Sequence, residues 1–299
     1  MFVVKVPATS ANLGPGFDCM GLALSLYNIF QVELGDCLQF RLRGKYTRFI
    51  APNKRNIFWK SACALWEQIG MEPRPLKVTI ESYIPPTRGL GSSSTAVVAG
   101  LLTANAIAGY PLNKNELLKL ATSIEGHPDN VAPAFHGGIT LTVMAENNTI
   151  VRVLSHNPKF KAVVVIPDFL LATKKSRKVL PSLVSRRDVT FNCSRVGLLV
   201  DCLLREEYDL LKIATQDRIH QSQRATLIPG MEEALSSAVE AGAYGAVLSG
   251  SGPTLLAFSP SDIAPKVADI MKQEFYNHSL QADALILDID SQGAIIREQ

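Results

Sequence analysis

Apolar and polar positions alternate, or recur every three to four residues, along most of the first half of the chain. Leu76–Ser82 alternates strictly, with every second residue apolar, which is typical of a half-buried strand. Asn56–Ile69 has its apolar residues at helical spacing. The same kinds of pattern predict strands at residues 2–6, 29–34 and 38–42 with a Gly-Asp turn at 35–36, a long apolar helix starting near Ser93, and a second helix at Asn113–Ser123.

In the rest of the chain, strands and helices do not alternate strictly, which favours an α+β fold over a doubly wound sheet. The pattern predicts paired strands at 137–143 and 150–154 around a polar turn at 146–148, strands at 162–167, 245–249, 254–258 and 283–289, and helices at 194–204, 207–215, 231–241 and 261–273. The length of 299 residues, at about 150 residues per domain, suggests two domains. We place them at residues 1–155 and 156–299.

Composition excludes several classes of protein. The net charge of +3 is small and spread along the chain, so we expect no nucleic-acid partner. The uncharged stretch 89–113 has an apolar part shorter than the about 20 residues of a membrane span, so we expect a buried helix and no membrane contact. The N-terminus does not resemble a signal peptide. Five cysteines without a Cys-x-x-Cys pair favour a cytoplasmic protein with reduced thiols.

The most informative segment is Pro85–Thr95, PPTRGLGSSST, which joins a predicted strand to a predicted helix. Its glycines allow a close approach of the backbone to a ligand, and the unpaired amides at the start of a helix stabilise an anion. It is neither a Walker A loop nor a Rossmann turn, because the Gly-Lys-Ser/Thr ending and the third glycine are missing. The segment therefore favours phosphate binding, and the alternative is a helix start capped by a serine.

Three other turns carry polar residues at defined places. Pro7–Asp18 combines two glycines and two prolines with Asn12 and Asp18, and its alternative is a purely structural turn. Leu248–Leu256 is either a plain hairpin or a loop that presents its amides to a ligand. Ile124–Pro133 gathers two acidic residues, a histidine and an asparagine, which could hold Mg²⁺ or form an ordinary polar loop. A zinc site is not expected, since no His-x-x-x-His and no nearby cysteine pair is present.

Taken in this order, the four segments resemble the small-molecule kinase superfamily of galactokinase, homoserine kinase, mevalonate kinase and phosphomevalonate kinase, and within it the homoserine kinases. The resemblance rests on VPATSANLGPGFD at 6–18, RGLGSSS at 88–94, EGHPDNVAP at 125–133 and LSGSGPT at 248–254, together with TKKSRKVLP at 173–181 and HQSQRATLIPG at 220–230. It implies an N-terminal domain like the second domain of ribosomal protein S5 and a C-terminal ferredoxin-like domain. It also implies ATP-dependent phosphorylation of the L-homoserine hydroxyl on the route to threonine, in an enzyme that is commonly a homodimer.

Carried over by position, the resemblance assigns roles to individual residues. ATP phosphates would lie against the loop made of Pro86, Thr87, Arg88, Gly89, Leu90, Gly91, Ser92, Ser93, Ser94 and Thr95. Ser93 and Glu125 would bind Mg²⁺. L-homoserine would be surrounded by Asn12, Asp18, His127, Thr173, Arg177 and Arg224. An amino acid needs Arg for its carboxylate and an acidic group for its ammonium, which agrees with this set.

Asn130 occupies the position at which mevalonate-type relatives have an aspartate that could act as a base, and an amide cannot accept a proton. We therefore expect catalysis by positioning and charge neutralisation, without a protein base. The alternatives are a sister kinase for mevalonate, a sugar or a diphosphocytidyl alcohol, and a binding or sensor protein that keeps the ATP fold without catalysis. A nucleic-acid-binding protein with an S5-like domain is disfavoured by the charge distribution.

Overall fold

The computed structural model describes residues 1–146 and 148–299, so Asn147 of the predicted polar turn lies outside the described residues. The first half of the chain builds a sheet in which β1, β2, β4 and β3 are neighbours in that order, and β5 pairs with the far end of β2. The strands are β1 (Phe2–Ala11), β2 (Met20–Leu34), β3 (Gln39–Gly44), β4 (Leu76–Ser82), β5 (Ile139–Ala145) and β6 (Asn148–Ser155). All pairs are antiparallel except β3 with β4.

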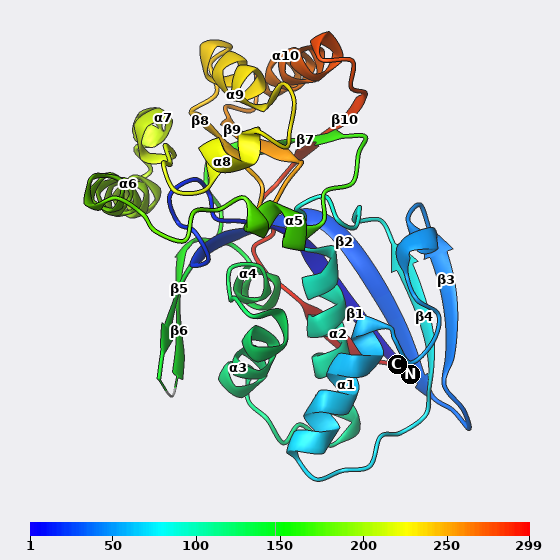
Figure 1. Cartoon of the computed structure of the whole chain (residues 1–299). Coiled ribbons are helices and arrows are strands. Elements are labelled where there is room, and N and C mark those ends of the chain that lie inside the picture. Colours follow the sequence, from blue (N-terminus) through cyan, green and yellow to red (C-terminus); the bar gives the residue numbers. More distant parts are fainter. Residues whose placement is uncertain (147) are drawn as a thin grey trace.

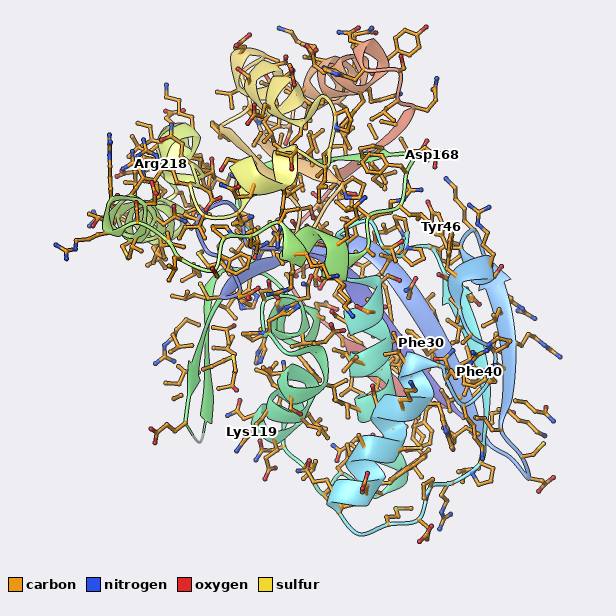
Figure 2. The ribbon with its side chains drawn as sticks, in the orientation of Figure 1. Phe30, Phe40, Tyr46, Lys119, Asp168 and Arg218 are labelled. Atoms are coloured by element: carbon orange, nitrogen blue, oxygen red, sulfur yellow. The ribbon has the colours of Figure 1, made fainter. Side chains whose placement is uncertain are left out.

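Helices cover one face of this sheet (Figure 1). They are α1 (Ile57–Gln68), α2 (Ser92–Ile107), α3 (Lys114–Glu125) and α4 (Val131–His136), and a short 3-10 helix η1 (Thr47–Phe49) follows β3. Phe30 of β2 stacks on Phe58 of α1 in the core between the two layers (Figure 2). The uncharged stretch becomes α2, which is buried along most of its length, as predicted. No helix of the described residues is long and apolar enough to cross a membrane.

The second sheet has the order β10, β7, β9, β8, with antiparallel neighbours. Its strands are β7 (Lys161–Pro167), β8 (Gly245–Leu248), β9 (Leu255–Ser259) and β10 (Ala282–Leu287), and its helices are α5 (Thr173–Lys178), α6 (Arg186–Arg205), η2 (Tyr208–Leu210), α7 (Leu211–Ala214), α8 (Gln221–Ala225), α9 (Met231–Glu240) and α10 (Ala264–Asn277). One face of the sheet packs on α9 and α10. The other packs on α6 and α7 and on apolar residues of β2, so one core joins the two sheets.

The structure confirms the α+β class and corrects several boundaries. β1 continues to Ala11 and β2 already begins at Met20, so the first polar turn is only residues 12–19. The predicted strands 29–34 and 38–42 are not neighbours, because β4 lies between them. The short helices α4, α5 and α8 were not predicted, and α6 begins at Arg186 instead of 194.

The end of the chain returns to the first sheet, which the sequence did not predict. β11 (Ile295–Glu298) pairs with β1, and the two termini lie side by side (Figure 1). A division of the chain after residue 155 separates β6 from β7 but leaves β11 in the first sheet. The domain bounds 1–155 and 156–299 therefore remain a prediction.

Candidate active site

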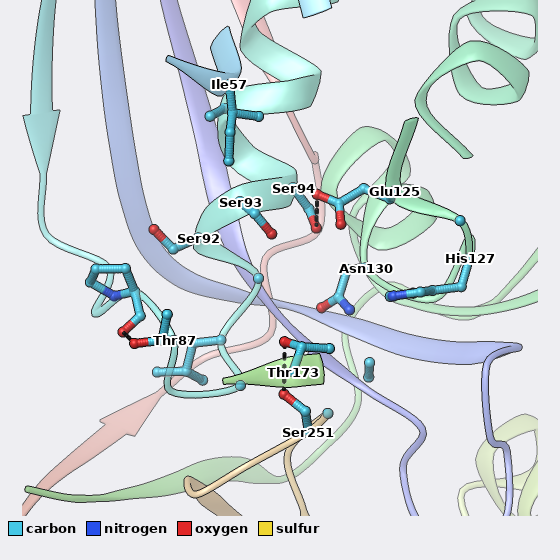
Figure 3. Close-up of a pocket in the computed structure, with 18 of the residues that line it drawn as sticks. Ile57, Thr87, Ser92, Ser93, Ser94, Glu125, His127, Asn130, Thr173 and Ser251 are labelled. Carbon is cyan, nitrogen blue, oxygen red and sulfur yellow. Dashed lines mark hydrogen bonds between the residues drawn. The ribbon is translucent and has the colours of Figure 1, made fainter. Parts of the chain in front are cut away.

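A cavity of about 990 Å³ lies where the two halves meet. Its walls come from the start of α2, the turn after β1, the segment between α3 and α4, α5, α8 and the β8–β9 loop. It brings together nearly all residues that the sequence singled out: Asn12, Asp18, Pro86, Thr87, Gly89, Leu90, Gly91, Ser92, Ser93, Ser94, Glu125, His127, Asn130, Thr173, Arg177 and Arg224. Figure 3 shows part of this set around the start of α2.

The glycine-rich loop ends at Gly91, which is the N-cap of α2 in a left-handed conformation with φ 66°. No side chain caps this helix in the structure, so the alternative of a serine N-cap is wrong. The amides at the start of α2 thus remain available for an anion, and the helix dipole adds a partial positive charge there. The side chains of Ser92 and Ser93 lie on the cavity side of the first turn (Figure 3).

Close packing explains why the loop needs glycine. A Cβ on Gly89 would lie 2.2 Å from the carbonyl oxygen of Ser249, and one on Gly91 would lie 1.9 Å from Oγ1 of Thr9. The Ser249 hydroxyl donates a hydrogen bond to the Gly89 carbonyl at 2.7 Å. The β8–β9 connection is therefore both a hairpin and a wall of the site, with Gly250 and Ser251 at the cavity.

Two residues of the predicted phosphate loop point elsewhere. Arg88 donates to the carbonyl of Pro167 and to Oδ1 of Asp168, which lies at the surface (Figure 2). Thr95 is fully buried, donates to the carbonyl of Ser92 and accepts from Asn28. Neither lines the cavity. Their side chains hold the loop against neighbouring strands, because an arginine head group on main-chain oxygen and a buried hydroxyl are no longer free for phosphate.

Glu125, the last residue of α3, faces the first turn of α2 across the cavity. Oε1 of Glu125 accepts a hydrogen bond from the Ser94 hydroxyl at 3.2 Å (Figure 3). Burial raises the pKa of Glu125, while His127 and the hydroxyls of Ser93 and Ser94 lower it. Among the described residues, no Lys, Arg or His forms an ion pair with this carboxylate. A half-buried carboxylate beside hydroxyl oxygens is a donor set that fits Mg²⁺.

Asp18 and Arg177 form a bidentate ion pair, with Nη1 and Nη2 of Arg177 at 3.0 and 2.6 Å from the two carboxylate oxygens. The hydrogen bonds that Arg177 donates to Asp18 raise the pKa of Arg177. The sequence placed both residues at the substrate but did not predict that they would contact each other. Phe17, which the sequence did not single out, lies between Arg177 and Arg224, its ring centre 5.5 and 5.4 Å from the two guanidinium carbons.

Arg224 is the most buried charge of the site, with 1% of its surface exposed. Its hydrogen bonds go to the carbonyls of Ser176 and Gly250 and to Nδ1 of His220. Burial, with Arg177 as a second cause, lowers the pKa of Arg224 to about 10. Nη2 has no hydrogen-bond acceptor among the described residues, and the residue borders the cavity. The arrangement offers a positive charge to an anionic group of a ligand.

His127, Asp129 and Asn130 form a chain of hydrogen bonds next to the glycine-rich loop. Nδ1 of His127 contacts Oδ1 of the buried Asp129, which also accepts from Nδ2 of Asn130 at 3.3 Å. Oδ1 of Asn130 accepts from the hydroxyl of Thr9 at 2.8 Å. Burial lowers the pKa of His127, but the hydrogen bond and charge of Asp129 outweigh it and raise the pKa above its ordinary value. Sequence reasoning named Asp129 in the cluster but gave it no role.

The carboxylates of Asp18 and Asp129 and the His127 ring offer ligand atoms within 4.8 Å of one another. The guanidinium of Arg177 already occupies both oxygens of Asp18. A divalent cation at this point would face that fixed positive charge, so the cluster suits an ammonium group better than a metal ion.

Asn12 and Thr173 line the cavity but are engaged by the protein itself. The Asn12 carboxamide donates to the carbonyl of Gly250 and accepts from the amide of Asp18, which fixes the turn that carries Asp18. The hydroxyls of Thr173 and Ser251 lie 3.3 Å apart (Figure 3). Thr173 begins α5 and its side chain is exposed, so it can exchange this partner for a ligand.

One end of the cavity is apolar and was missed by sequence reasoning. It is lined by Phe30, Phe49, Ile50, Ala51, Ile57, Ile80 and Ala96. These residues come from β2, η1 and the two residues after it, the first residue of α1, β4 and α2. No local signal distinguishes such residues from ordinary core positions, because only the packing of α1 and α2 leaves a space between them. This apolar end of the cavity is suited to bind a flat, uncharged ring.

Comparisons with known proteins agree with this geometry. The family model described as GHMP kinases N terminal domain matches residues 56–138, and the one described as GHMP kinases C terminal matches residues 199–278. A homoserine kinase of Desulfitobacterium hafniense is 52% identical over 296 residues, covering 99% of this chain and 100% of that one. A homoserine kinase of Trichodesmium erythraeum is 42% identical over 295 residues, with 98% and 97% covered.

Solved structures show the same fold. The crystal structure of a homoserine kinase from Cytophaga hutchinsonii superposes with a TM-score of 0.88 at 29% identity, covering 99% of this chain and 97% of that one. A mevalonate kinase of L. major, with a TM-score of 0.69 at 15% identity and 96% and 95% covered, shares the fold alone. The expected two-domain α+β architecture is confirmed. With both halves of the chain matched and relatives similar along its full length, this chain belongs to the GHMP kinase family.

Proposed function

We propose that this chain transfers the γ-phosphoryl group of ATP to the side-chain hydroxyl of L-homoserine, giving O-phospho-L-homoserine and ADP on the route to threonine. The observation that carries the proposal is Arg224, a buried guanidinium that pairs with no carboxylate among the described residues and lies in the same cavity as Asp18 and the glycine-rich loop. The relatives described above as homoserine kinases, which are similar over the full length, support the same substrate.

The two ends of the cavity suit the two substrates. The apolar end receives the adenine ring, and the amides at the start of α2 receive the phosphates. Arg224 pairs with the homoserine carboxylate, while Asp18 and Asp129 face its ammonium group. Because Asp18 and Arg177 form an ion pair in the structure, homoserine binding has to open this pair, so that Asp18 can bind the ammonium group and Arg177 can face the carboxylate.

A rival acceptor lacks one of these charges. Mevalonate has a carboxylate but no ammonium group, and a sugar such as galactose has neither. Mevalonate would give Asp18 and Asp129 no ammonium group to bind, and a sugar would in addition leave the buried Arg224 without a carboxylate, which is unfavourable for a buried charge. The polar end of the site therefore favours an amino acid over the acceptors of the sister kinases.

The test is a coupled assay of ADP release with ATP and L-homoserine, mevalonate or galactose as acceptor. We expect turnover with L-homoserine and at least 100-fold lower kcat/KM with the other two, roughly the effect of one lost charged contact. Turnover with mevalonate or galactose but not homoserine would replace the proposed substrate. Binding of ATP without turnover on any of the three would favour the binding or sensor protein.

We also propose that Ser93 and Glu125 hold Mg²⁺ at the phosphates. The ion would neutralise part of the phosphate charge, and the half-buried Glu125 carboxylate with its hydroxyl neighbours fits the role of a ligand. Glu125→Gln keeps the shape but removes the charge, so we expect the Mg²⁺ concentration for half-maximal activity to rise at least tenfold, about 1.4 kcal/mol. The exposed Glu72→Gln is the control, and an unchanged Mg²⁺ dependence for Glu125→Gln would exclude the glutamate as a ligand.

Asn130 serves the reaction as a positioned hydrogen-bonding group. Its amide oxygen is held by Thr9 and its amide nitrogen by Asp129, so it orients the acceptor region without accepting a proton. Phosphoryl transfer passes through a loose transition state, for which alignment and charge neutralisation matter most. In this account the homoserine hydroxyl loses its proton late, to the transferred phosphoryl group itself.

Asn130→Ala tests that account by steady-state kinetics. We expect kcat to fall by about 10- to 100-fold, as for one lost hydrogen bond in the transition state, with both KM values within a few-fold. A fall of many orders of magnitude while both substrates still bind would show that Asn130 does more than position, and that transfer without a protein base is wrong.

The cytoplasmic location and the homodimer implied by the resemblance remain part of this proposal. Sedimentation of the purified chain at several concentrations measures the oligomeric state directly.

A further inference from the structure

His220 has no role in the proposed reaction, yet it is one of the most buried polar side chains of the described residues, with 0% of its surface exposed. It precedes α8 as its N-cap, four residues before Arg224. Nε2 of His220 lies 2.7 Å from the carbonyl oxygen of Gly14, in the turn that carries Asp18, and Nδ1 lies 3.1 Å from Nη1 of Arg224. The ring thus bridges the two parts of the cavity that face opposite ends of an amino acid.

The partners of this ring determine its protonation. The Gly14 carbonyl can only accept, so Nε2 carries the proton, and Nη1 of Arg224 can only donate, so Nδ1 is the acceptor. The ring is therefore the neutral Nε2–H tautomer. Burial, and then the charge of Arg224, lower the pKa of His220, while Asp217 and Asp18 act in the opposite direction. The neighbouring charges that face the ring are thus Arg224, Asp217 and Asp18.

Asp217 binds the backbone around His220 and forms no ion pair with Arg224 among the described residues. Its carboxylate accepts from the side chain of Asn192 and from the backbone amides of Ile219, His220 and Gln221. Its Oδ2 lies 3.8 Å from Nε2 of His220, beyond hydrogen-bond distance. Phe17 packs against the imidazole, with its ring centre 5.2 Å from that of His220. Both ring nitrogens of His220 therefore have a partner, and an aromatic ring contacts the imidazole.

We propose that His220 is a positioning residue that holds Arg224 for the substrate carboxylate. Nη1 of Arg224 donates to Nδ1 of His220 and to the carbonyl of Gly250, and Nε donates to the carbonyl of Ser176. Nη2 is therefore left for the ligand. The Nε2–H of His220 ties this arrangement to the turn of Asp18, which sets the distance between the groups for carboxylate and ammonium. The inference rests on the proposed function, because it concerns how the same site recognises homoserine.

Two substitutions test the hydrogen bonds of Nδ1 and Nε2 of His220 one at a time. In His220→Gln the side-chain amide reaches the place of Nε2 and can still donate to Gly14, but the acceptor for Arg224 is lost. In His220→Asn the shorter amide places its oxygen near Nδ1 and can still accept from Arg224, but the bond to Gly14 is lost. His278→Asn is the matched control, since His278 lies in the same half of the chain, is 36% exposed and pairs only weakly with Glu233.

Each variant is assayed with L-homoserine and with 3-aminopropan-1-ol, which is homoserine without its carboxylate. For His220→Gln we expect the KM for homoserine to rise about 10- to 100-fold, with kcat and the KM for ATP changed less than threefold. The kcat/KM for 3-aminopropan-1-ol should stay within threefold of the unsubstituted chain. For His220→Asn the KM for homoserine should stay within about fivefold of that of the unsubstituted chain. His278→Asn should change neither kcat nor KM for either acceptor.

Equal losses with both acceptors, or a raised KM for ATP, would mean that His220 only supports the fold, and the inference would be wrong. An unsubstituted chain that phosphorylates another acceptor but not homoserine would instead overturn the proposed function. Should His220→Gln fail to fold, ¹⁵N NMR of the histidines in the unsubstituted chain decides. We expect an unprotonated Nδ1 for His220 whose shift responds to homoserine but not to 3-aminopropan-1-ol; a protonated Nδ1 contradicts the proposal.

Discussion

His136 ends α4 with its Nε2 buried and without a hydrogen-bond partner among the described residues. Burial, followed by the positive charge of Lys114 and of His156, lowers its pKa from 6.5 to about 4. The unfolded chain therefore binds a proton at this residue below about pH 6.5 that the folded protein does not bind until about pH 4. Stability from the neutral ring is present above pH 6.5 and is lost as the pH falls towards 4.

His136→Gln removes this titration. We expect the urea midpoint of the unsubstituted chain to fall more steeply between pH 6.5 and 4 than that of the variant, in equilibrium unfolding monitored by fluorescence. His127, whose pKa is raised, contributes with the opposite sign, but it is common to both proteins and cancels in the difference. His278→Asn should keep the steep dependence, and equal slopes for His136→Gln and the unsubstituted chain would contradict the prediction.

Single residues of the candidate site could be named from sequence, but their contacts could not. Asp18 and Arg177 are 159 positions apart, and no pattern in the sequence indicates that they form an ion pair. Arg88 shows the opposite case. Its place in the glycine-rich loop predicted a contact with phosphate, but in the folded protein its side chain binds Pro167 at the end of β7 and the following Asp168. Local residue type indicates chemistry, while the direction of a side chain depends on its neighbours.

Both ends of α2 have a glycine with positive φ, which makes a matched pair of substitutions. Gly109, after the helix, has φ 81° and open space around a Cβ, so Gly109→Ala should cost only the left-handed strain, about 1 kcal/mol. Gly91 has φ 66° and would also press a Cβ against Thr9 and Asn130. We expect Gly91→Ala to be destabilised by about 1–3 kcal/mol more in urea unfolding.

Gly91→Ala should also raise the KM for ATP, because the added methyl group displaces Asn130 and the first turn of α2 at the phosphate site. Gly109→Ala should leave this KM unchanged. If the two variants had the same stability and the same KM for ATP, the tight contact between the glycine-rich loop and β1 would not matter for either property.

Elements with a complete local signal were predicted well. Asn56 caps α1, Asn113 forms a capping box at α3, and β4 has the bounds read from its alternation. The short helices α4, α5 and α8 have six, six and five residues, which is too few for a periodic pattern or for stability in isolation. Tertiary contacts hold them. Residues of α5 and α8 line the cavity, and so does Asn130, the N-cap of α4.

The C-terminal segment ties the two sheets together. Between β10 and β11, Asp290 accepts from the Tyr27 hydroxyl of β2 at 2.8 Å and from the amides of Gln292 and Gly293. Its relative exposure is 9%, so these bonds are shielded from water. Asp290→Ala leaves several donors without an acceptor, and we expect a loss of about 2–3 kcal/mol in the free energy of unfolding.

The measurement is equilibrium unfolding in urea, with the exposed Asp262→Ala as control. Tyr27→Phe removes one of the bonds alone and should show an intermediate loss. Since a shared core joins the sheets, both should unfold in one transition. A loss for Asp290→Ala no greater than for Asp262→Ala would show that the segment does not stabilise the junction.

Residue types and their spacing were sufficient to indicate an α+β fold with a phosphate-binding loop, because glycine-rich turns, helix caps and alternating strands are local features. The resemblance of short segments to the kinase superfamily added the activity and named most residues of the cavity. The return of β11 to β1, the apolar end of the cavity, the Asp18–Arg177 pair and the contact of His220 with Gly14 join residues far apart in the chain. They depend on which surfaces meet when the two sheets pack. Short-range patterns carry no information about such meetings, so only the folded structure decides them.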